Sequence, residues 1–161
     1  MTEVTENLKH LYEKDYNLWI LKTVNKLESR EFSKLDLDNL IEEVADLSKR
    51  SKRKLQSLLI KLIEHLLKLT YWENENQKSK GHWRAEIRNF RQQINLELDD
   101  SPSLKPYLLE IYNDCYHKGR AIAADRSQLP LETFPETPMA DLENILDENW
   151  FPFDSTQKKS N

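Results

Sequence analysis

The sequence has 161 residues, a mass of 19.2 kDa and a net charge of −4, with only two glycines and one cysteine. So few glycines exclude a glycine-rich dinucleotide-binding turn and a phosphate-binding P-loop, which both need glycine at fixed positions. The lone Cys115 excludes an intramolecular disulfide and a paired-cysteine zinc site. With no membrane-length apolar run and no secretory signal, these features predict a cytoplasmic protein.

Abundant leucine, glutamate and lysine favour helix along the whole chain. Apolar residues recur every three or four positions from about Glu6 to Ser29, which predicts a first amphipathic helix. Asp36 or Asp38 can cap a second helix. Its buried stripe is expected to consist of Leu37, Leu40, Ile41, Val44 and Leu47. A third helix is predicted from about Ser51 to Trp72, and the sequence leaves open whether the second and third are continuous.

The third helix has apolar residues on two sides, which predicts that it is the central helix of a bundle. A polar loop, ENENQKSKG, separates it from a fourth helix predicted from about His82 to Leu98. Ser101 and Pro102 are typical of a helix start and predict a fifth helix that extends to about Arg126.

The C-terminal part begins with an extended, proline-containing stretch, LPLETFPETP, in which Thr137 and Pro138 predict a short last helix. That helix is expected from Met139 to about Leu146, followed by an apolar anchor of Trp150, Phe151 and Phe153. We therefore expect an all-α, single-domain bundle of five or six helices over residues 1–154. The C-terminal segment should pack back onto it, and residues 155–161 should form a disordered tail.

Polar residues stand at apolar positions of three predicted helices. His65 replaces a leucine in its row, Glu43 lies at the edge of its stripe beside Glu42, and Arg91 lies between two isoleucines. If they face one interior, they could form an acid–base or metal site. A structural ion-pair network is favoured, because buried charges are normally paired whether or not chemistry occurs there. The histidine and glutamate spacing of di-iron bundles is absent, so we expect no metal and no cofactor.

Basic residues are concentrated in SKRSKRK, at Lys49, Arg50, Lys52, Arg53 and Lys54. Together with basic residues as far as Arg91, this patch could bind phosphates. Alternatively it is a solvated helix face that attracts the acidic C-terminal segment, which has no Lys or Arg between Arg126 and Lys158. The isoelectric point of 5.6 favours the second interpretation.

Six strings follow the order seen in the domain of unknown function 29 family: YEKDYNLWI, LDLDNLIEEVADL, EHLLKL, HWRAEIRNFRQQI, SPSLKPYL and LPLETFPETP. They span about Tyr12 to Pro152, so nearly the whole sequence resembles this family of bacterial and cyanobacterial proteins. The resemblance implies a compact all-helical fold, but no activity, substrate or cofactor. The positions that match its recognisable motifs include Glu42, Glu43, His65, Trp83 and Arg91.

Three functional hypotheses follow from these observations. The leading one is a non-enzymatic interaction or regulatory module that binds another protein. The second is a nucleic-acid-associated protein that uses the stretch from Lys49 to Arg91, and the third is an enzyme built on Glu43, His65 and Arg91. The sequence does not predict the oligomeric state.

Overall fold

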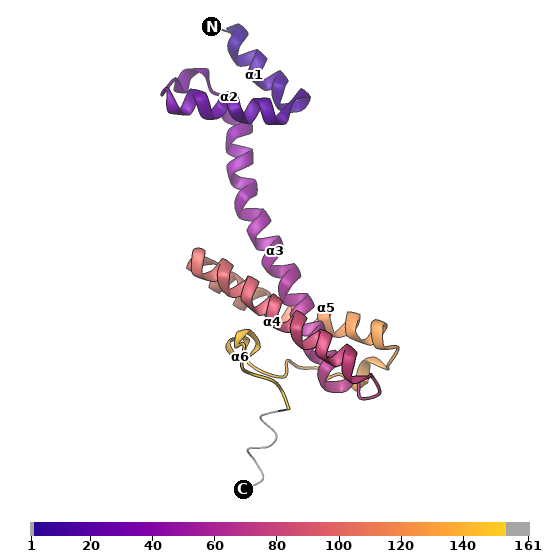
Figure 1. Ribbon diagram of the computed structural model, residues 1–161. Coiled ribbons are helices and arrows are strands. Elements are labelled where there is room, and N and C mark those ends of the chain that lie inside the picture. The colour runs from indigo at the N-terminus through magenta and orange to yellow at the C-terminus, as the bar shows by residue number, and fades with distance from the viewer. Residues whose placement is uncertain (1, 154–161) are drawn as a thin grey trace. The chain divides into compact units, whose positions relative to one another are not determined.

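The computed structural model describes residues 2–153, which form helices and loops without any strand. The α-helices are α1 (Thr2–Lys14), α2 (Tyr16–Glu28), α3 (Leu37–Tyr71), α4 (Gln77–Asp100), α5 (Lys105–Ser127) and α6 (Leu142–Leu146) (Figure 1). Three short 3-10 helices join them: η1 (Phe32–Lys34), η2 (Pro102–Leu104) and η3 (Leu131–Thr133). The all-α fold class is thereby confirmed, whereas the predicted tail, 155–161, lies outside the described residues.

The chain divides into two compact units, Met1–Arg50 and Ser51–Asn161. The sequence predicted one domain over residues 1–154 and did not anticipate this division. The boundary falls inside α3, which is one helix of 35 residues, so the second and third predicted helices are continuous.

In the first unit, the helix predicted from Glu6 to Ser29 is instead two helices. The backbone of Asp15 leaves helical geometry, with φ −149° and ψ 84°. The Asp15 carboxylate accepts a hydrogen bond from the Leu18 amide at 3.0 Å, which caps α2. The rings of Tyr12 and Trp19 pack edge to face with centroids 4.9 Å apart, so α1 is held against α2 across the break.

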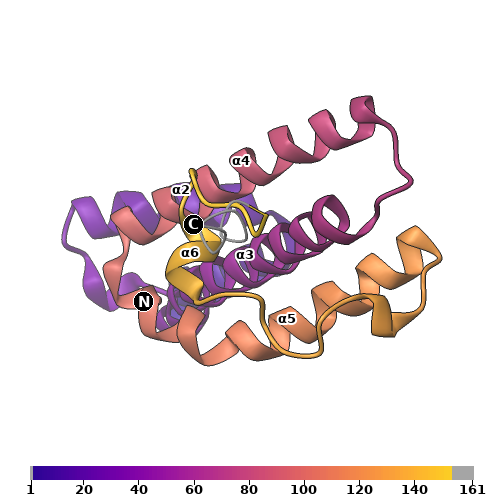
Figure 2. The same ribbon diagram turned by 90° about the horizontal axis from the view of Figure 1, so that it is seen from below.

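In the second unit, the later half of α3 is the central helix, as predicted. Figure 2 shows it between α4 and α5. Its buried apolar side chains are Leu55, Leu58, Leu59, Leu62, Ile63, Leu66, Leu67 and Leu69. α5 approaches closely at Gly119, where an added Cβ would lie 3.0 Å from the Ile60 carbonyl oxygen of α3. Glycine at this position therefore allows two helix backbones to pack directly against each other.

The C-terminal segment of the second unit packs back onto the helices, as predicted. Phe134, Leu142, Ile145 and Leu146 are buried in the core of this unit. Side chains of α4 and α5 donate hydrogen bonds to backbone carbonyls of the segment. The pairs are Arg91 with Ile145, Asn95 with Leu146, Tyr112 with Ala140, Tyr116 with Pro135, and Arg120 with Phe134. These side chains satisfy the carbonyls of a segment that has little helix of its own.

Some predicted helix starts are wrong by several residues. α4 begins at Gln77 because the Asn76 side chain accepts a hydrogen bond from the Ser79 amide at 2.9 Å, so Gly81 lies within the helix. α6 begins at Leu142 and not at Met139. Ser101 precedes η2, but its side chain makes no capping hydrogen bond.

Candidate functional site

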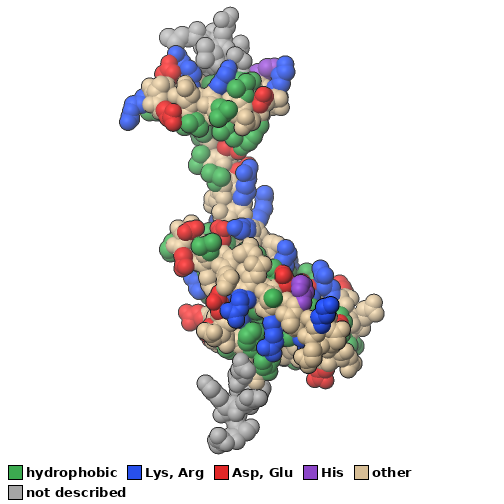
Figure 3. Space-filling model, in the orientation of Figure 1, with side chains coloured by type: hydrophobic (Ala, Val, Ile, Leu, Met, Phe, Trp, Pro, Cys, Tyr) green, Lys and Arg blue, Asp and Glu red, His purple; other side chains and the backbone are tan. Residues whose placement is uncertain are grey.

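The first unit carries most of the exposed large apolar side chains of the described chain, ten of thirteen. Four of these exposed side chains belong to the apolar stripe predicted on α3. Leu37, Ile41, Val44 and Leu47 are between 53% and 64% exposed. The prediction that this stripe is buried was therefore wrong. The space-filling view shows apolar side chains gathered on this unit (Figure 3).

The apolar side chains of α2 and α3 adjoin one another, and we call their surface the apolar face. It consists of Tyr16, Ile20, Val24, Leu27, Leu37, Leu40, Ile41, Val44 and Leu47. Seven of these residues line a groove of about 240 Å³ between α2 and the start of α3, whereas Leu37 and Ile41 lie outside it. Trp19 and Thr23, both buried, also line the groove, and the Thr23 hydroxyl has no hydrogen-bond partner among the described residues.

The polar end of the groove is formed by Glu43 and Arg50. The Glu43 carboxylate accepts hydrogen bonds from the hydroxyls of Tyr12 and Tyr16, each at 2.6 Å, and lies 3.8 Å from the Arg50 guanidinium. These two hydrogen bonds lower the pKa of Glu43, and the bond from Tyr12 has the larger effect. The bond between Tyr12 and Glu43 also raises the pKa of Tyr12 to about 12. Glu43 therefore stays ionised at neutral pH and joins α1, α2 and α3 within the unit.

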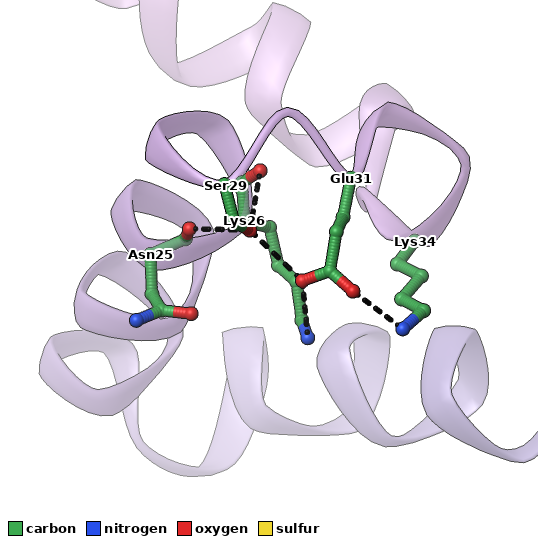
Figure 4. Close-up of polar contacts among 5 residues, drawn as sticks. All are labelled: Asn25, Lys26, Ser29, Glu31 and Lys34. Atoms are coloured by element: carbon green, nitrogen blue, oxygen red, sulfur yellow. Dashed lines mark hydrogen bonds and ion pairs between the residues drawn. The ribbon is translucent and has the colours of Figure 1, made fainter.

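A polar turn ends α2 and fixes the chain before η1 (Figure 4). The Glu31 carboxylate accepts hydrogen bonds from Lys34 at 2.6 Å, Ser29 at 2.8 Å and Lys26 at 3.2 Å. These three bonds, led by the one from Lys34, lower the pKa of Glu31 to about 2. Arg30 takes the left-handed conformation, with φ 58°, at a position where glycine is usual.

The five residues of the predicted polar cluster do not share one network. Within residues 2–153, no hydrogen bond or ion pair joins any two of them. Glu42 and Glu43 belong to the first unit, whereas His65, Trp83 and Arg91 belong to the second. Glu42 is exposed on α3, whereas each of the other four has partners of its own on the elements around it.

His65 lies against Phe90 of α4, with ring centroids 5.1 Å apart, and its Nδ1 is 2.8 Å from the Lys61 carbonyl oxygen. Burial lowers the pKa of His65 below its ordinary value, with a further contribution from the charge of Lys68. The ring is thus held neutral by its packing and is placed as a core side chain. Trp83 stacks on Trp72, with the Lys68 ammonium 5.0 Å from the Trp83 ring centroid.

Arg91 is fully buried, and its Nε donates to the Ile145 carbonyl at 2.7 Å. The guanidinium also lies 5.2 Å from the centroid of the Phe151 ring, and its Nη atoms have no hydrogen-bond partner among the described residues. Burial lowers its pKa to about 10. Arg91 therefore holds the C-terminal segment against α4.

Most of the predicted basic patch already has partners. Lys49 lies 3.9 Å from Asp46, Arg50 pairs with Glu43, and Lys54 pairs with Glu97. Lys52 lies 5.3 Å from the centroid of the Tyr107 ring. Arg53 lines a separate cavity of about 330 Å³ in the second unit, together with Lys61 and Arg126. Within residues 2–153, the partners of the patch are thus acids and a ring of the helices, not the acidic C-terminal segment.

Sequence reasoning missed a buried ion pair in the second unit. Glu64, whose side chain is 3% exposed, lies 2.7 Å from the Arg126 Nε and 3.3 Å from the Lys68 ammonium. The one-turn spacing of Glu64 and Lys68 could have indicated their pairing.

Burial and the neighbouring Asp114 raise the pKa of Cys115 to about 11, so its thiol stays protonated at neutral pH. In the described part of the chain, no three His, Cys, Asp or Glu side chains are grouped as a metal would require.

Comparison with known proteins identifies one family. A model described as "Domain of unknown function DUF29" matches residues 11–151. Neither the curated proteins nor the solved structures include a match to the chain. The described helices include none with the length and apolar character needed to cross a membrane. Because the family model covers most of the chain, from α1 to the C-terminal anchor, the chain belongs to the DUF29 family.

Proposed function

We propose that this chain is a non-enzymatic protein-interaction module that binds its partner through the apolar face of the first unit. The observation that carries the proposal is the exposure of that face beside a groove of about 240 Å³. Apolar patches larger than a few hundred square ångströms are rare on monomeric proteins and mark interaction surfaces.

The small core of the first unit supports this proposal. Its described side chains, from residue 8 to residue 50, include only three buried apolar ones: Leu8, Trp19 and Leu35. A unit of this size buries too little apolar area to be stable on its own and generally needs added support, such as a partner. Covering the apolar face supplies the burial that the unit lacks.

The contacts of the candidate catalytic residues favour a binding role over an enzymatic one. The Glu43 carboxylate is occupied by two tyrosine hydroxyls, and Arg91 is enclosed by the C-terminal segment. His65 packs on Phe90 and is hydrogen-bonded to its own helix. A general acid or base must reach a substrate proton, and these three groups are engaged in holding the fold.

Site-specific photocrosslinking in the native cell tests the proposal. A photoreactive residue replaces Ile41, which is 64% exposed on the apolar face, and the matched control replaces Leu96, which is 62% exposed on α4. We expect a discrete adduct, identified by mass spectrometry, from position 41 but not from position 96. The adduct should disappear when Val44→Glu is added. Absence of an adduct at position 41, or equal adducts at both positions, would overturn the proposal.

A second candidate function is binding of a nucleic-acid backbone, which the cavity lined by Arg53, Lys61 and Arg126 favours. Arg53 and Lys61 make no ion pair among the described residues, so both remain able to contact phosphates. Gln56 and Ser57 line the same cavity and add hydrogen-bonding groups.

Fluorescence anisotropy with a labelled duplex tests this second candidate. Affinity should fall steeply between about 50 and 200 mM salt, because each phosphate contact releases counterions. The double variant Lys52→Glu, Arg53→Glu should bind more weakly and with a shallower salt dependence. Binding that is absent at low salt, or insensitive to salt, would contradict the candidate.

A further inference from the structure

We propose that the partner of the apolar face is the same face of a second copy of this chain, related by a two-fold axis. This inference rests on the proposed function, because it names the partner of the same surface. It commits to a homodimer formed by the first unit, through α2 and the start of α3.

The charge of the segment is suited to pairing with itself. Residues 16–50 contain six basic and seven acidic side chains, so two copies would not repel each other strongly. Several of these charges already have partners within the unit, as in Glu31 with Lys26 and Lys34, and Glu43 with Arg50. A strongly charged partner would therefore find no complementary field, and recognition must come from shape and apolar area.

The shape of the face contains both a ridge and a groove. Leu37 and Ile41 stand one helical turn apart on α3, outside the groove, and are 53% and 64% exposed. Beside them runs the groove between α2 and α3, lined by residues such as Val24 and Leu47. A two-fold axis would place the ridge of each copy in the groove of the other, as helix ridges pack into grooves.

The apolar face has the apolar character that the core of a dimer interface needs. A standard interface takes roughly 800 Å² and 20–30 residues from each partner, with a core more apolar than the surrounding surface. Seven exposed large apolar side chains of the apolar face, from Leu27 at 40% to Ile41 at 64%, provide such a core within 32 consecutive residues, 16–47. One contact with a second copy would cover the apolar face on both chains at once.

The mass of the purified full-length chain in solution tests this inference. Light scattering coupled to size exclusion should give twice the chain mass of 19.2 kDa for the wild type. Ile41→Glu should give the monomer mass with an unchanged far-ultraviolet circular dichroism spectrum, because an exposed position accepts a charge without loss of helix. The matched control Leu96→Glu, exposed on α4, should remain dimeric.

A wild-type chain that is monomeric up to about 200 µM would overturn the inference, because this concentration is far above the dissociation constant of a dimer with micromolar affinity. So would an Ile41→Glu variant that stays dimeric. The dimer and the proposed function can fail separately. A monomeric wild type that still crosslinks to a different protein from position 41 refutes only the dimer. A monomer that crosslinks to nothing from that position refutes both.

Discussion

Substitution of the two glycines by alanine should change stability in opposite directions. At Gly119 of α5, an added Cβ would lie 2.9 Å from Ile63 Cγ2 and 3.0 Å from the Ile60 carbonyl oxygen. The carbonyl belongs to the backbone of α3, and Ile63 is buried, so neither atom can move without disturbing the core. At Gly81 of α4, an added Cβ would have no atom within 4 Å apart from its chain neighbours and the backbone of its own helix, so Gly81 provides the matched control.

Magnitudes decide the sign at each position. Alanine in place of glycine inside a helix gains up to about 1 kcal/mol from backbone propensity. Overpacking a core costs about 1–3 kcal/mol, and the rigid backbone carbonyl of Ile60 places Gly119 in the upper half of that range, at about 2–3 kcal/mol. Gly119→Ala should therefore lose about 1–2 kcal/mol of unfolding free energy, whereas Gly81→Ala should gain about 0.5–1 kcal/mol.

Urea denaturation followed by tryptophan fluorescence measures both changes. Trp72, Trp83 and Trp150 lie in the second unit with both glycines, so the signal reports mainly that unit. With a slope of about 2 kcal/mol per molar urea, the Gly119→Ala midpoint should fall by roughly 0.5–1 M. A Gly119→Ala midpoint equal to or above the wild-type value would refute the close contact between α3 and α5.

Three further predictions concern single side chains. Burial lowers the pKa of His65 below 6.5, so as the pH falls the unfolded chain takes up a proton at His65 before the folded chain does. The free energy of unfolding should therefore fall as the pH drops below 6.5. The urea midpoint of His65→Leu should lack this pH dependence. The lowered pKa of Glu43 means that its ionised form stabilises the fold above pH 4.5, and that this stabilisation is lost as the pH falls through the pKa of the folded state. The wild type should therefore melt at a higher temperature than Glu43→Gln at neutral pH, and this difference should vanish in acid. Tyr116→Phe leaves the Pro135 carbonyl without its hydrogen-bond donor and should lower the free energy of unfolding by about 1–2 kcal/mol. Limited proteolysis should then cut residues 129–153 faster than in the wild type. Unchanged cleavage would contradict the role of this bond.

Helix-forming composition and periodicity were enough to predict the fold class and the core of the second unit. The row of leucines on the later half of α3 is long and two-sided, which predicts burial against neighbours on both sides. Proline and the apolar anchor at Trp150 and Phe151 indicated that the C-terminal segment would return to the helices. These signals are local, and they agree with the tertiary packing.

The break at Asp15 and the exposed stripe on α3 could not be predicted in the same way. The apolar spacing continues through Asp15, so periodicity permits a continuous helix as well as two helices, and the contact of Tyr12 with Trp19 favours two. Periodicity also shows that one side of a helix is apolar but not what covers it. Leu37 and Ile41 belong to the apolar side of α3 and are nevertheless exposed, and the proposed partner rests on that exposure.

The predicted polar cluster depended on residues that are far apart in sequence sharing one interior. Helix spacing placed Glu43, His65 and Arg91 on apolar faces, but it could not assign those faces to the same unit. Their partners are side chains and carbonyls close to each of them, such as the Ile145 carbonyl for Arg91. The register between distant helices is set by packing, which one sequence does not reveal.

Thiol labelling tests most directly whether the apolar face is covered by a second copy. The native Cys115 is buried, and its pKa is raised to about 11, so it contributes little background at neutral pH. Ile41→Cys and the control Leu96→Cys, which are similarly exposed in the single chain, are alkylated over a range of protein concentrations. We predict that labelling of Ile41→Cys slows as the concentration rises, while that of Leu96→Cys does not change. Equal and concentration-independent rates at the two positions would contradict the account.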